Sequence, residues 1–156
     1  MADTKTILIV CTGNSCRSPM AEGLLKKALQ DAGRLNTEVI SAGVIAVDGS
    51  VVSEHSIEAM SEIGIDISGY RTSALTADLI RKADIILVME KIHLFSVTDM
   101  VPEAKEKTFL LREFAADEAN PAADPAVPDP IGRPPEYYKR CRDLLQKATE
   151  EIFKKL

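Results

Sequence analysis

The residue types most able to do chemistry in this sequence are Cys11 and Arg17, which lie six positions apart. Cys11 directly follows the wholly apolar run Ile7–Val10, a pattern typical of a strand buried on both faces. Ser18 and Pro19 then read as the N-cap and first residue of a helix. A helix N-terminus offers unpaired N–H groups, and a guanidinium can hold two oxygens of a tetrahedral anion. The arrangement therefore predicts a loop that binds a phosphate-like oxyanion.

The same positive surroundings favour the thiolate form of Cys11, so the sequence also predicts a nucleophile able to attack bound phosphorus. Ser18 serves either as the helix N-cap or as a hydroxyl that hydrogen-bonds the thiolate, and the two roles are compatible. The alternative is that Cys11 is an inert core thiol and the loop a plain connection. The strand before the loop, the glycine inside it and the helix after it favour the nucleophile.

The loop between these two residues supplies the candidate binding groups. Gly13 lets the loop curl around an anion. Cys16 fits two roles equally well: a core residue of the first helical turn, or the partner of Cys11 in a reversible disulfide that protects the nucleophile from over-oxidation. The predicted phosphate-binding residues are Thr12, Gly13, Asn14, Ser15, Cys16 and Ser18.

Apolar runs and helical periodicities alternate along the chain. Strands are expected at 7–10, 37–43, 83–89 and 107–111, and helices from Ser18 to about Gly33, over 52–63, from Thr76, from about Lys91 and at the C-terminus. A long proline-rich loop is expected over 115–135. The alternation predicts an α/β fold, with a parallel sheet covered by helices on both faces and ligands bound where strands end.

Three further positions carry simpler interpretations. His55 and His93 follow no partner pattern and are interpreted as surface or capping residues. Cys141 is expected to be buried packing, on a closing helix whose apolar face is Tyr137, Cys141, Leu144, Ala148 and Ile152.

Composition limits the classes of function. The chain has 156 residues, 19 Lys+Arg against 24 Asp+Glu and a net charge of −5, which predicts one domain over 1–156 that binds neither nucleic acid nor an anionic membrane. No apolar run approaches the roughly 20 residues that a membrane helix needs, and Met1–Lys5 lacks the features of a secretory signal. Three cysteines do not suggest a disulfide framework. We therefore expect a cytoplasmic protein with reduced thiols.

The segment Val10–Glu22, with the sequence VCTGNSCRSPMAE, strongly resembles the low-molecular-weight protein tyrosine phosphatase family. The match continues through Ser41-Ala42-Gly43, Gly64-Ile65-Asp66, the strand from Ala83 to Met89 and Asp129-Pro130. The resemblance implies a three-layer α/β/α fold with a four-stranded parallel sheet in the order 2-1-3-4 and a phosphate loop after the first strand. It also implies phosphorylated proteins as substrates, no metal or other cofactor, and a monomer or weak homodimer.

The resemblance further assigns roles to individual residues. Cys11 would attack the phosphoryl group, and Arg17 and the loop N–H groups would stabilise its charge. Asp129 would protonate the leaving group and later activate the water that hydrolyses the cysteinyl phosphate. The residues alone favour Asp129 only slightly over Asp117 and Asp124 of the same loop.

Supporting residues are also implied. Asn14 and Ser41 resemble the buried polar residues that hold the family's phosphate loop open, and Tyr70 stands where the family often has a histidine that partners the loop asparagine. From the residues alone, Asn14 is equally a turn asparagine and Ser41 a strand-end serine.

The residue that faces the substrate in the loop is expected to select it. Tyrosine-specific members of the family carry a bulky aliphatic residue there and bacterial protein-arginine phosphatases a threonine, and Ser15 resembles the second group. Ile131 stands where eukaryotic tyrosine-directed members place tyrosines, so no aromatic clamp is expected. The sequence thus leans towards a protein-arginine phosphatase, with a protein-tyrosine phosphatase as the alternative.

Two other functions are less favoured. An arsenate reductase-like enzyme of this fold would need further cysteines in the middle of the chain, and residues 78–98 contain none. A phosphate-binding module without catalysis would lack Cys11, Arg17 or the late aspartate, and all three are present.

Overall fold

The computed structural model describes residues 4–116 and 124–156. In these residues strands and helices alternate, as expected from the sequence. The elements are β1 Lys5–Cys11, α1 Arg17–Asp31, β2 Thr37–Gly43, α2 Glu54–Ser61, α3 Ala77–Lys82, β3 Ile85–Val88, α4 Lys91–Met100, the 3-10 helix η1 Pro102–Lys107, β4 Thr108–Leu110, α5 Leu111–Ala115 and α6 Pro135–Lys154.

The four strands form one parallel sheet in the order β2-β1-β3-β4, so the predicted topology is confirmed. β1 is an inner strand and pairs with β2 from Lys5 opposite Thr37 to Cys11 opposite Gly43. This position suits the run Ile7–Val10, whose side chains are all 0% exposed. Cys11 thus lies at the carboxyl end of an inner strand, where ligands bind in such folds.

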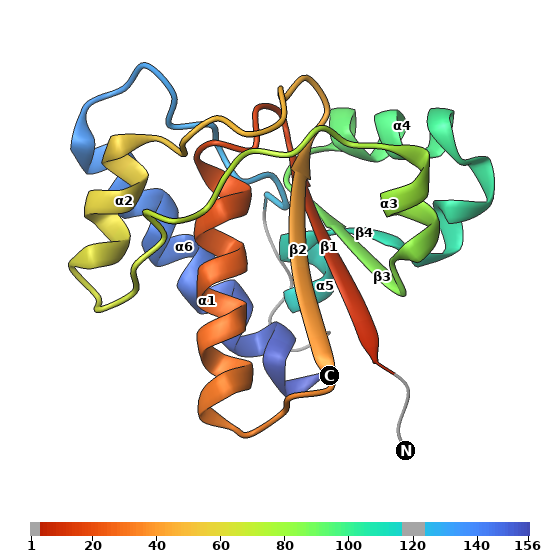
Figure 1. Cartoon of the computed structure of the whole chain (residues 1–156), viewed down its shortest axis with the longest axis horizontal. Coiled ribbons are helices and arrows are strands. Elements are labelled where there is room, and N and C mark those ends of the chain that lie inside the picture. Colours follow the sequence, from red (N-terminus) through yellow and green to blue (C-terminus); the bar gives the residue numbers. More distant parts are fainter. Residues whose placement is uncertain (1–3, 117–123) are drawn as a thin grey trace.

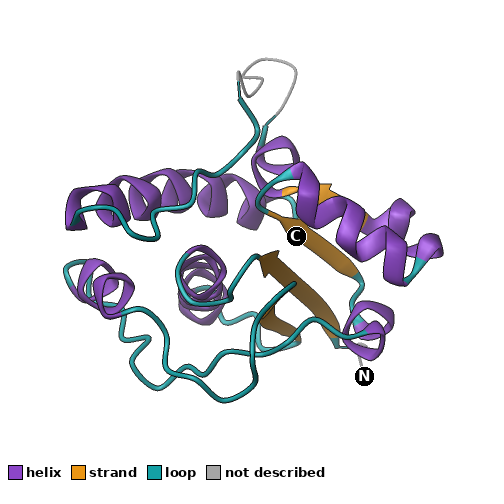
Figure 2. Cartoon of the chain, turned by 90° about the horizontal axis from the view of Figure 1, so that it is seen from above, coloured by secondary structure: helices purple, strands orange, loops and turns teal. Residues whose placement is uncertain are grey.

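Helices cover both faces of the sheet (Figures 1 and 2). Because successive side chains of a strand point to opposite faces, Ile7, Ile9 and Cys11 face the layer that contains α1, α2 and α6. Leu8 and Val10 face the layer that contains α3 and α4. The three-layer arrangement predicted from the sequence is confirmed, and it turns the Cys11 side chain towards α1.

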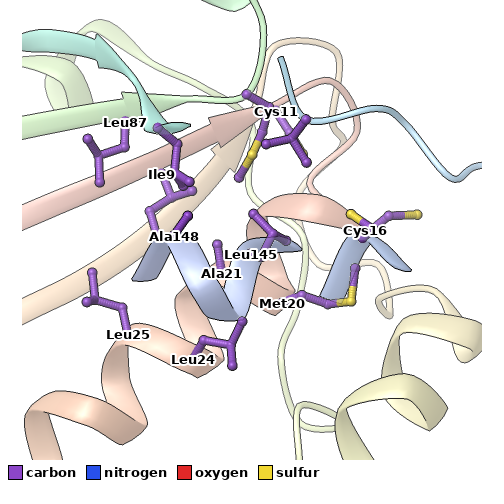
Figure 3. Close-up of a cluster of buried hydrophobic side chains, with 14 of the residues drawn as sticks. Ile9, Cys11, Cys16, Met20, Ala21, Leu24, Leu25, Leu87, Leu145 and Ala148 are labelled. Atoms are coloured by element: carbon purple, nitrogen blue, oxygen red, sulfur yellow. The ribbon is translucent and has the colours of Figure 1, made fainter. Parts of the chain in front are cut away.

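The sulfur atoms of Cys11 and Cys16 belong to the core between the sheet, α1 and α6 (Figure 3). The two residues are 2% and 4% exposed, and both thiols are free. Cys141 lies in the same core, as predicted, and burial raises the pKa of its thiol to about 12. Cys141 is therefore a neutral packing residue.

The structure differs from the prediction at the start of α1 and along the buried face of α6. α1 begins at Arg17 with Cys16 as N-cap, so Ser18 lies inside the first turn and does not cap it. In α6 the buried face contains Tyr138 and Leu145 in place of Tyr137 and Leu144. In each pair of α6 the two neighbours are the same residue type, so periodicity alone does not fix which one faces the core.

Two short helices, η1 and α5, were not predicted. They flank β4, and α5 ends at Ala115, where the predicted proline-rich loop begins. Part of that loop, 117–123, lies outside the described residues, and 124–134 contains neither helix nor strand. Among the helices that the structure describes, none is long and apolar enough to cross a membrane.

Gly43, the last residue of β2, lies directly against the backbone of the loop that follows β1. A Cβ atom at this position would lie 2.6 Å from the Thr12 carbonyl oxygen and 2.7 Å from the Asn14 nitrogen. Real Cβ atoms do not approach backbone this closely, so only glycine lets β2 support the loop in its present place.

We expect Gly43→Ala to displace the loop, to destabilise the fold by about 1–3 kcal/mol and to weaken oxyanion binding. Urea unfolding and the inhibition constant of inorganic phosphate measure the two effects. Gly69→Ala is the matched control, because a Cβ at Gly69 meets no atom within 4 Å. Equal losses in the two variants would contradict a specific contact between Gly43 and the loop.

Candidate active site

The loop after β1 turns its carbonyl groups outward and leaves its N–H groups unpaired. The carbonyl groups of Cys11, Thr12 and Ser15 accept hydrogen bonds of 3.0, 3.0 and 2.9 Å from backbone N–H groups in the segment 44–53. No group of residues 4–116 or 124–156 accepts a hydrogen bond from the backbone N–H groups of 12–18. Unpaired N–H groups that converge at a helix N-terminus form a site for an anion.

Asn14 fixes the bend of this loop. Its φ of 54° lies in the left-handed region, which asparagine tolerates better than most residues. The side chain is 1% exposed, and its amide nitrogen donates to Ser18 Oγ at 2.7 Å and to Ser41 Oγ at 2.9 Å. Its amide oxygen accepts from the Ser73 backbone at 2.8 Å. The structure thus brings Asn14 and Ser41 into contact, which is the arrangement expected of residues that hold the loop open.

Ser18 links this amide to the candidate nucleophile. Its Oγ lies 2.9 Å from Cys11 Sγ. Since the same oxygen accepts from Asn14, the Ser18 hydroxyl proton is free to point at the sulfur. A hydrogen bond donated to sulfur stabilises the thiolate form. The position of Ser18 inside the helix, which differs from the predicted N-cap, is what allows this contact.

Arg17 closes the loop with a buried guanidinium that is held along one edge. The side chain is 2% exposed, and Nη1 donates to Glu90 Oε2 at 2.6 Å and to the Val127 carbonyl at 2.7 Å. Nη2 lies 3.2 Å from Thr12 Oγ1. Within the described part of the chain, Nε has no partner. The edge formed by Nε and Nη2 therefore remains for a bidentate contact with an oxyanion.

Glu90 was missed from the sequence, although it is the charge partner of Arg17. It follows β3 by two residues, at the carboxyl end of a strand adjacent to β1. The sequence feature that could have revealed Glu90 is a carboxylate just after a buried strand, because the carboxyl ends of parallel strands meet at one edge of the sheet.

Asp129 lies at the mouth of the site. Its Oδ1 accepts from the Ile131 backbone at 3.1 Å, and its Oδ2 lies 3.6 Å from Arg17 Nη2. The side chain is 36% exposed. A carboxylate held beside the oxyanion-binding edge and open to water can pass a proton to or from a bound group.

Ser15 and Cys16 lie on the side of the loop towards α6. Ser15 is half-buried, and its Oγ lies 3.6 Å from Cys16 Sγ. Cys16 Sγ in turn lies 4.0 Å from the Tyr138 hydroxyl. Both loop thiols are free here, so a protective disulfide between Cys11 and Cys16 stays a hypothesis.

Tyr70 lies outside the hydrogen bonds of the loop. The structure does not pair it with Asn14, because the Ser73 backbone already occupies the amide oxygen of that side chain. The Tyr70 ring instead lies under Lys26, whose Nζ is 4.8 Å from the ring centroid. Together with Arg71, these residues line a shallow cavity of about 190 Å³.

Comparisons with known proteins bear on this geometry. The profile of the family described as low molecular weight phosphotyrosine protein phosphatase matches residues 6–156. The chain belongs to this family. The resemblance of Val10–Glu22 is thereby confirmed, and members of the family are phosphatases that use a cysteine nucleophile.

Individual phosphatases of the family are similar over nearly the whole chain. A protein-arginine-phosphatase of Geobacillus stearothermophilus is 40% identical over 150 residues, which cover 96% of this chain and 95% of the relative. A low-molecular-weight protein tyrosine phosphatase from T. tengcongensis superposes with a TM-score of 0.88 at 36% identity, covering 98% of this chain and 100% of the other.

A third similar protein is informative about chemistry. It is a YwlE arginine phosphatase in which a cysteine is replaced by serine, and its active-site serine is phosphorylated. It superposes on this phosphatase with a TM-score of 0.87 at 34% identity and covers 97% of this chain and 95% of its own.

His93 was interpreted as a surface or capping residue, and only the second part is correct. The side chain is 0% exposed. Its Nδ1 accepts a hydrogen bond from the Glu90 backbone at 3.1 Å, which caps α4, while Nε2 lies 2.8 Å from Thr12 Oγ1. Burial and, secondarily, the nearby Arg17 charge lower the pKa of His93 to about 4. In this phosphatase His93 is therefore neutral at pH 7.

This lowered pKa makes stability depend on pH. An unfolded chain protonates His93 near the ordinary value of 6.5, whereas the folded protein does so near 4. Stability from this residue is therefore fully present above pH 6.5 and is lost as the pH falls towards 4. Urea unfolding should show a loss of about 1–2 kcal/mol between pH 7 and pH 5 from this group, after allowance for solvent screening.

His93→Gln should remove this part of the pH dependence, and the matched control His55→Gln, at a partly exposed histidine, should keep it. An unchanged pH dependence in His93→Gln would contradict a neutral, buried His93.

Proposed function

We propose that this chain is a protein phosphatase in which Cys11 is the nucleophile and Asp129 the general acid and base. The observation that carries the proposal is the set of N–H groups left unpaired, within the described residues, in the loop that follows Cys11, together with the Nε and Nη2 edge of Arg17. A phosphoryl group on these donors has its three oxygens neutralised and its phosphorus next to the sulfur.

In the first step the Cys11 thiolate attacks phosphorus, and an S–P bond forms as the bond to the leaving group breaks. Asp129 gives its proton to the leaving atom, and Arg17 and the loop N–H groups stabilise the phosphoryl charge. In the second step Asp129 takes a proton from water, whose oxygen attacks phosphorus. The S–P bond breaks, and the Ser18 hydroxyl stabilises the departing thiolate.

The phosphorylated active-site serine of the YwlE variant supports this two-step route. A serine that takes the place of a cysteine and carries phosphate marks, in that protein, the atom that receives the phosphoryl group. Cys11, at the start of the loop and with its sulfur 2.9 Å from Ser18 Oγ, is the residue of this chain that fits the same role.

For the substrate we propose phosphoarginine in proteins, with phosphotyrosine as the alternative. Ser15 places a small hydroxyl side chain in the loop, where an aliphatic residue would pack against a phenyl ring. Ile131, 61% exposed, offers no aromatic clamp beside Asp129. The Geobacillus stearothermophilus relative is named for arginine. The family, the T. tengcongensis relative and a Ralstonia nicotianae relative that is also 40% identical are named for tyrosine, which keeps the alternative open.

We also propose a cytoplasmic enzyme that acts as a monomer or weak homodimer. Three free, buried cysteines support a reducing compartment, because a cysteine nucleophile works as the thiolate and is lost on oxidation.

We expect the protein to release phosphate from a small aryl phosphate in the presence of a chelator, and Cys11→Ser to abolish this turnover. Asp129→Asn should lower kcat by about 10²–10⁴-fold, because the leaving group then departs without a proton. Asp124→Asn is the matched control in the same loop. Steady-state kinetics measure all three. Full turnover by Cys11→Ser would refute the nucleophile, and phosphate binding without turnover by the wild type would indicate a binding module.

Phosphoarginine and phosphotyrosine peptides of matched sequence test the substrate. We expect the wild type to prefer phosphoarginine. Ser15→Ile should shift the ratio of the two kcat/KM values towards phosphotyrosine by about tenfold or more, because it replaces a polar contact with an apolar packing contact. Ser15→Thr, which keeps the hydroxyl, should retain the preference. Equal phosphoarginine turnover by Ser15→Ile would overturn the role of Ser15.

A further inference from the structure

The Thr12 hydroxyl lies between two nitrogen atoms at the edge of the phosphate loop. Its Oγ1 is 3.2 Å from Arg17 Nη2 and 2.8 Å from His93 Nε2. A guanidinium only donates hydrogen bonds, so Arg17 takes one lone pair of Thr12 Oγ1. The direction of the second contact depends on which nitrogen of His93 carries the proton.

The start of α4 fixes that proton. The Glu90 backbone N–H points at His93 Nδ1 over 3.1 Å, and a backbone nitrogen only donates, so Nδ1 must be the acceptor. A neutral imidazole carries one proton, which is then on Nε2. Burial lowers the pKa of His93 to about 4, which agrees with a neutral ring. His93 therefore donates from Nε2 to Thr12 Oγ1.

Both lone pairs of Thr12 Oγ1 are then occupied, and the hydroxyl proton must be donated. Among the residues that the structure describes, no acceptor for this proton lies within hydrogen-bond distance. The donor edge of Arg17, where an oxyanion binds in the proposed function, is the neighbouring group.

We propose that the Thr12 side chain is an additional donor to the bound phosphoryl group, and that His93 is the positioning residue that turns its proton towards the site. This rests on the proposed function, because the ligand is the oxyanion held by the loop. The backbone of the loop provides N–H groups that no described residue accepts. The hydroxyl adds a side-chain donor whose direction is set from outside the loop, by the first turn of α4.

Burial of Thr12 and His93 makes the Thr12 hydroxyl an effective hydrogen-bond donor. Thr12 is half-buried and His93 fully buried, so neither hydrogen bond to Thr12 Oγ1 competes freely with water. A hydrogen bond to a charged group is stronger than one between neutral groups. No reorganisation is needed when the anion enters, because the hydroxyl proton already lacks another acceptor.

Inorganic phosphate binding to the Cys11→Ser protein tests the donor without turnover. We expect Thr12→Val, which keeps the shape and removes the hydroxyl, to weaken the Kd measured by calorimetry about tenfold. Thr12→Ser should restore most of the affinity, because it returns the hydroxyl. Thr98→Val, the same substitution in α4 away from the loop, is the control. If Thr12→Val unfolds, Thr12→Ala replaces it in the same comparison.

A double-mutant cycle tests the role of His93. His93→Phe removes the Nε2 donor and should weaken phosphate binding several-fold. In the Thr12→Val background it should cause no further loss, because the hydroxyl that it orients is gone. A residue that only stabilises the fold would weaken both backgrounds equally.

Two outcomes would overturn the inference. Unchanged phosphate affinity in Thr12→Val shows that the hydroxyl does not donate to the anion. Additive losses for His93→Phe and Thr12→Val show that His93 does not act through Thr12. If the wild-type enzyme binds phosphate but shows no turnover, the proposed catalysis is refuted. The phosphate-binding test of Thr12 and His93 remains valid in that case.

Discussion

The structure depends on a partly buried loop whose backbone N–H groups find no acceptor among the described residues. Buried polar groups without partners cost free energy, so this loop persists only because other contacts hold it open. The carbonyl groups of the loop are fastened to the segment after β2, and the Asn14 amide is fastened at three points. Gly43 lets β2 approach the loop closely enough for those bonds to form. The cost of the unpaired groups is offset when an oxyanion binds.

Burying Arg17 also costs free energy, because its cationic side chain has almost no contact with water. Removing such a charge from water is costly unless it is paired and hydrogen-bonded. Nη1 meets Glu90 and the Val127 carbonyl. Among the described residues, the groups near Nη2 are the Thr12 hydroxyl and, at 3.6 Å, Asp129. One edge of the guanidinium thus stabilises the fold and the other serves the ligand. Asp129, whose side chain is 36% exposed, is the carboxylate that can leave this cation when an anion enters.

Local patterns in the sequence were sufficient for the strands of the sheet and for the centre of the site, whereas the strand order followed from the family resemblance. The run Ile7–Val10 predicted an inner strand because it is apolar on both faces, and the predicted bounds of β2, 37–43, are those observed. Cys11 and Arg17 follow because both lie on one continuous strand-loop-helix unit. Glu90 and His93 could not be found in this way. Their roles arise from the α4 N-terminus meeting the loop across the sheet, a contact between residues about 80 positions apart.

The difference between local sequence patterns and long-range contacts also separates the parts of the phosphate loop. Some follow from the motif itself, and others depend on contacts with other elements of this chain. The backbone donors, Cys11 and Arg17 form a continuous unit, so a relative that keeps the motif keeps the anion site. Thr12 and Ser15 are both small hydroxyl residues, and their contacts lead to elements outside this unit. Thr12 Oγ1 lies 2.8 Å from His93 Nε2. Ser15 Oγ lies 3.6 Å from Cys16 Sγ, which is 4.0 Å from the Tyr138 hydroxyl. Hydroxyl groups can serve the polar, planar guanidine of an arginine side chain, whereas they offer little to a phenyl ring. In the proposed function Ser15 therefore favours arginine over tyrosine, on a loop whose backbone donors bind the phosphoryl group whichever side chain carries it.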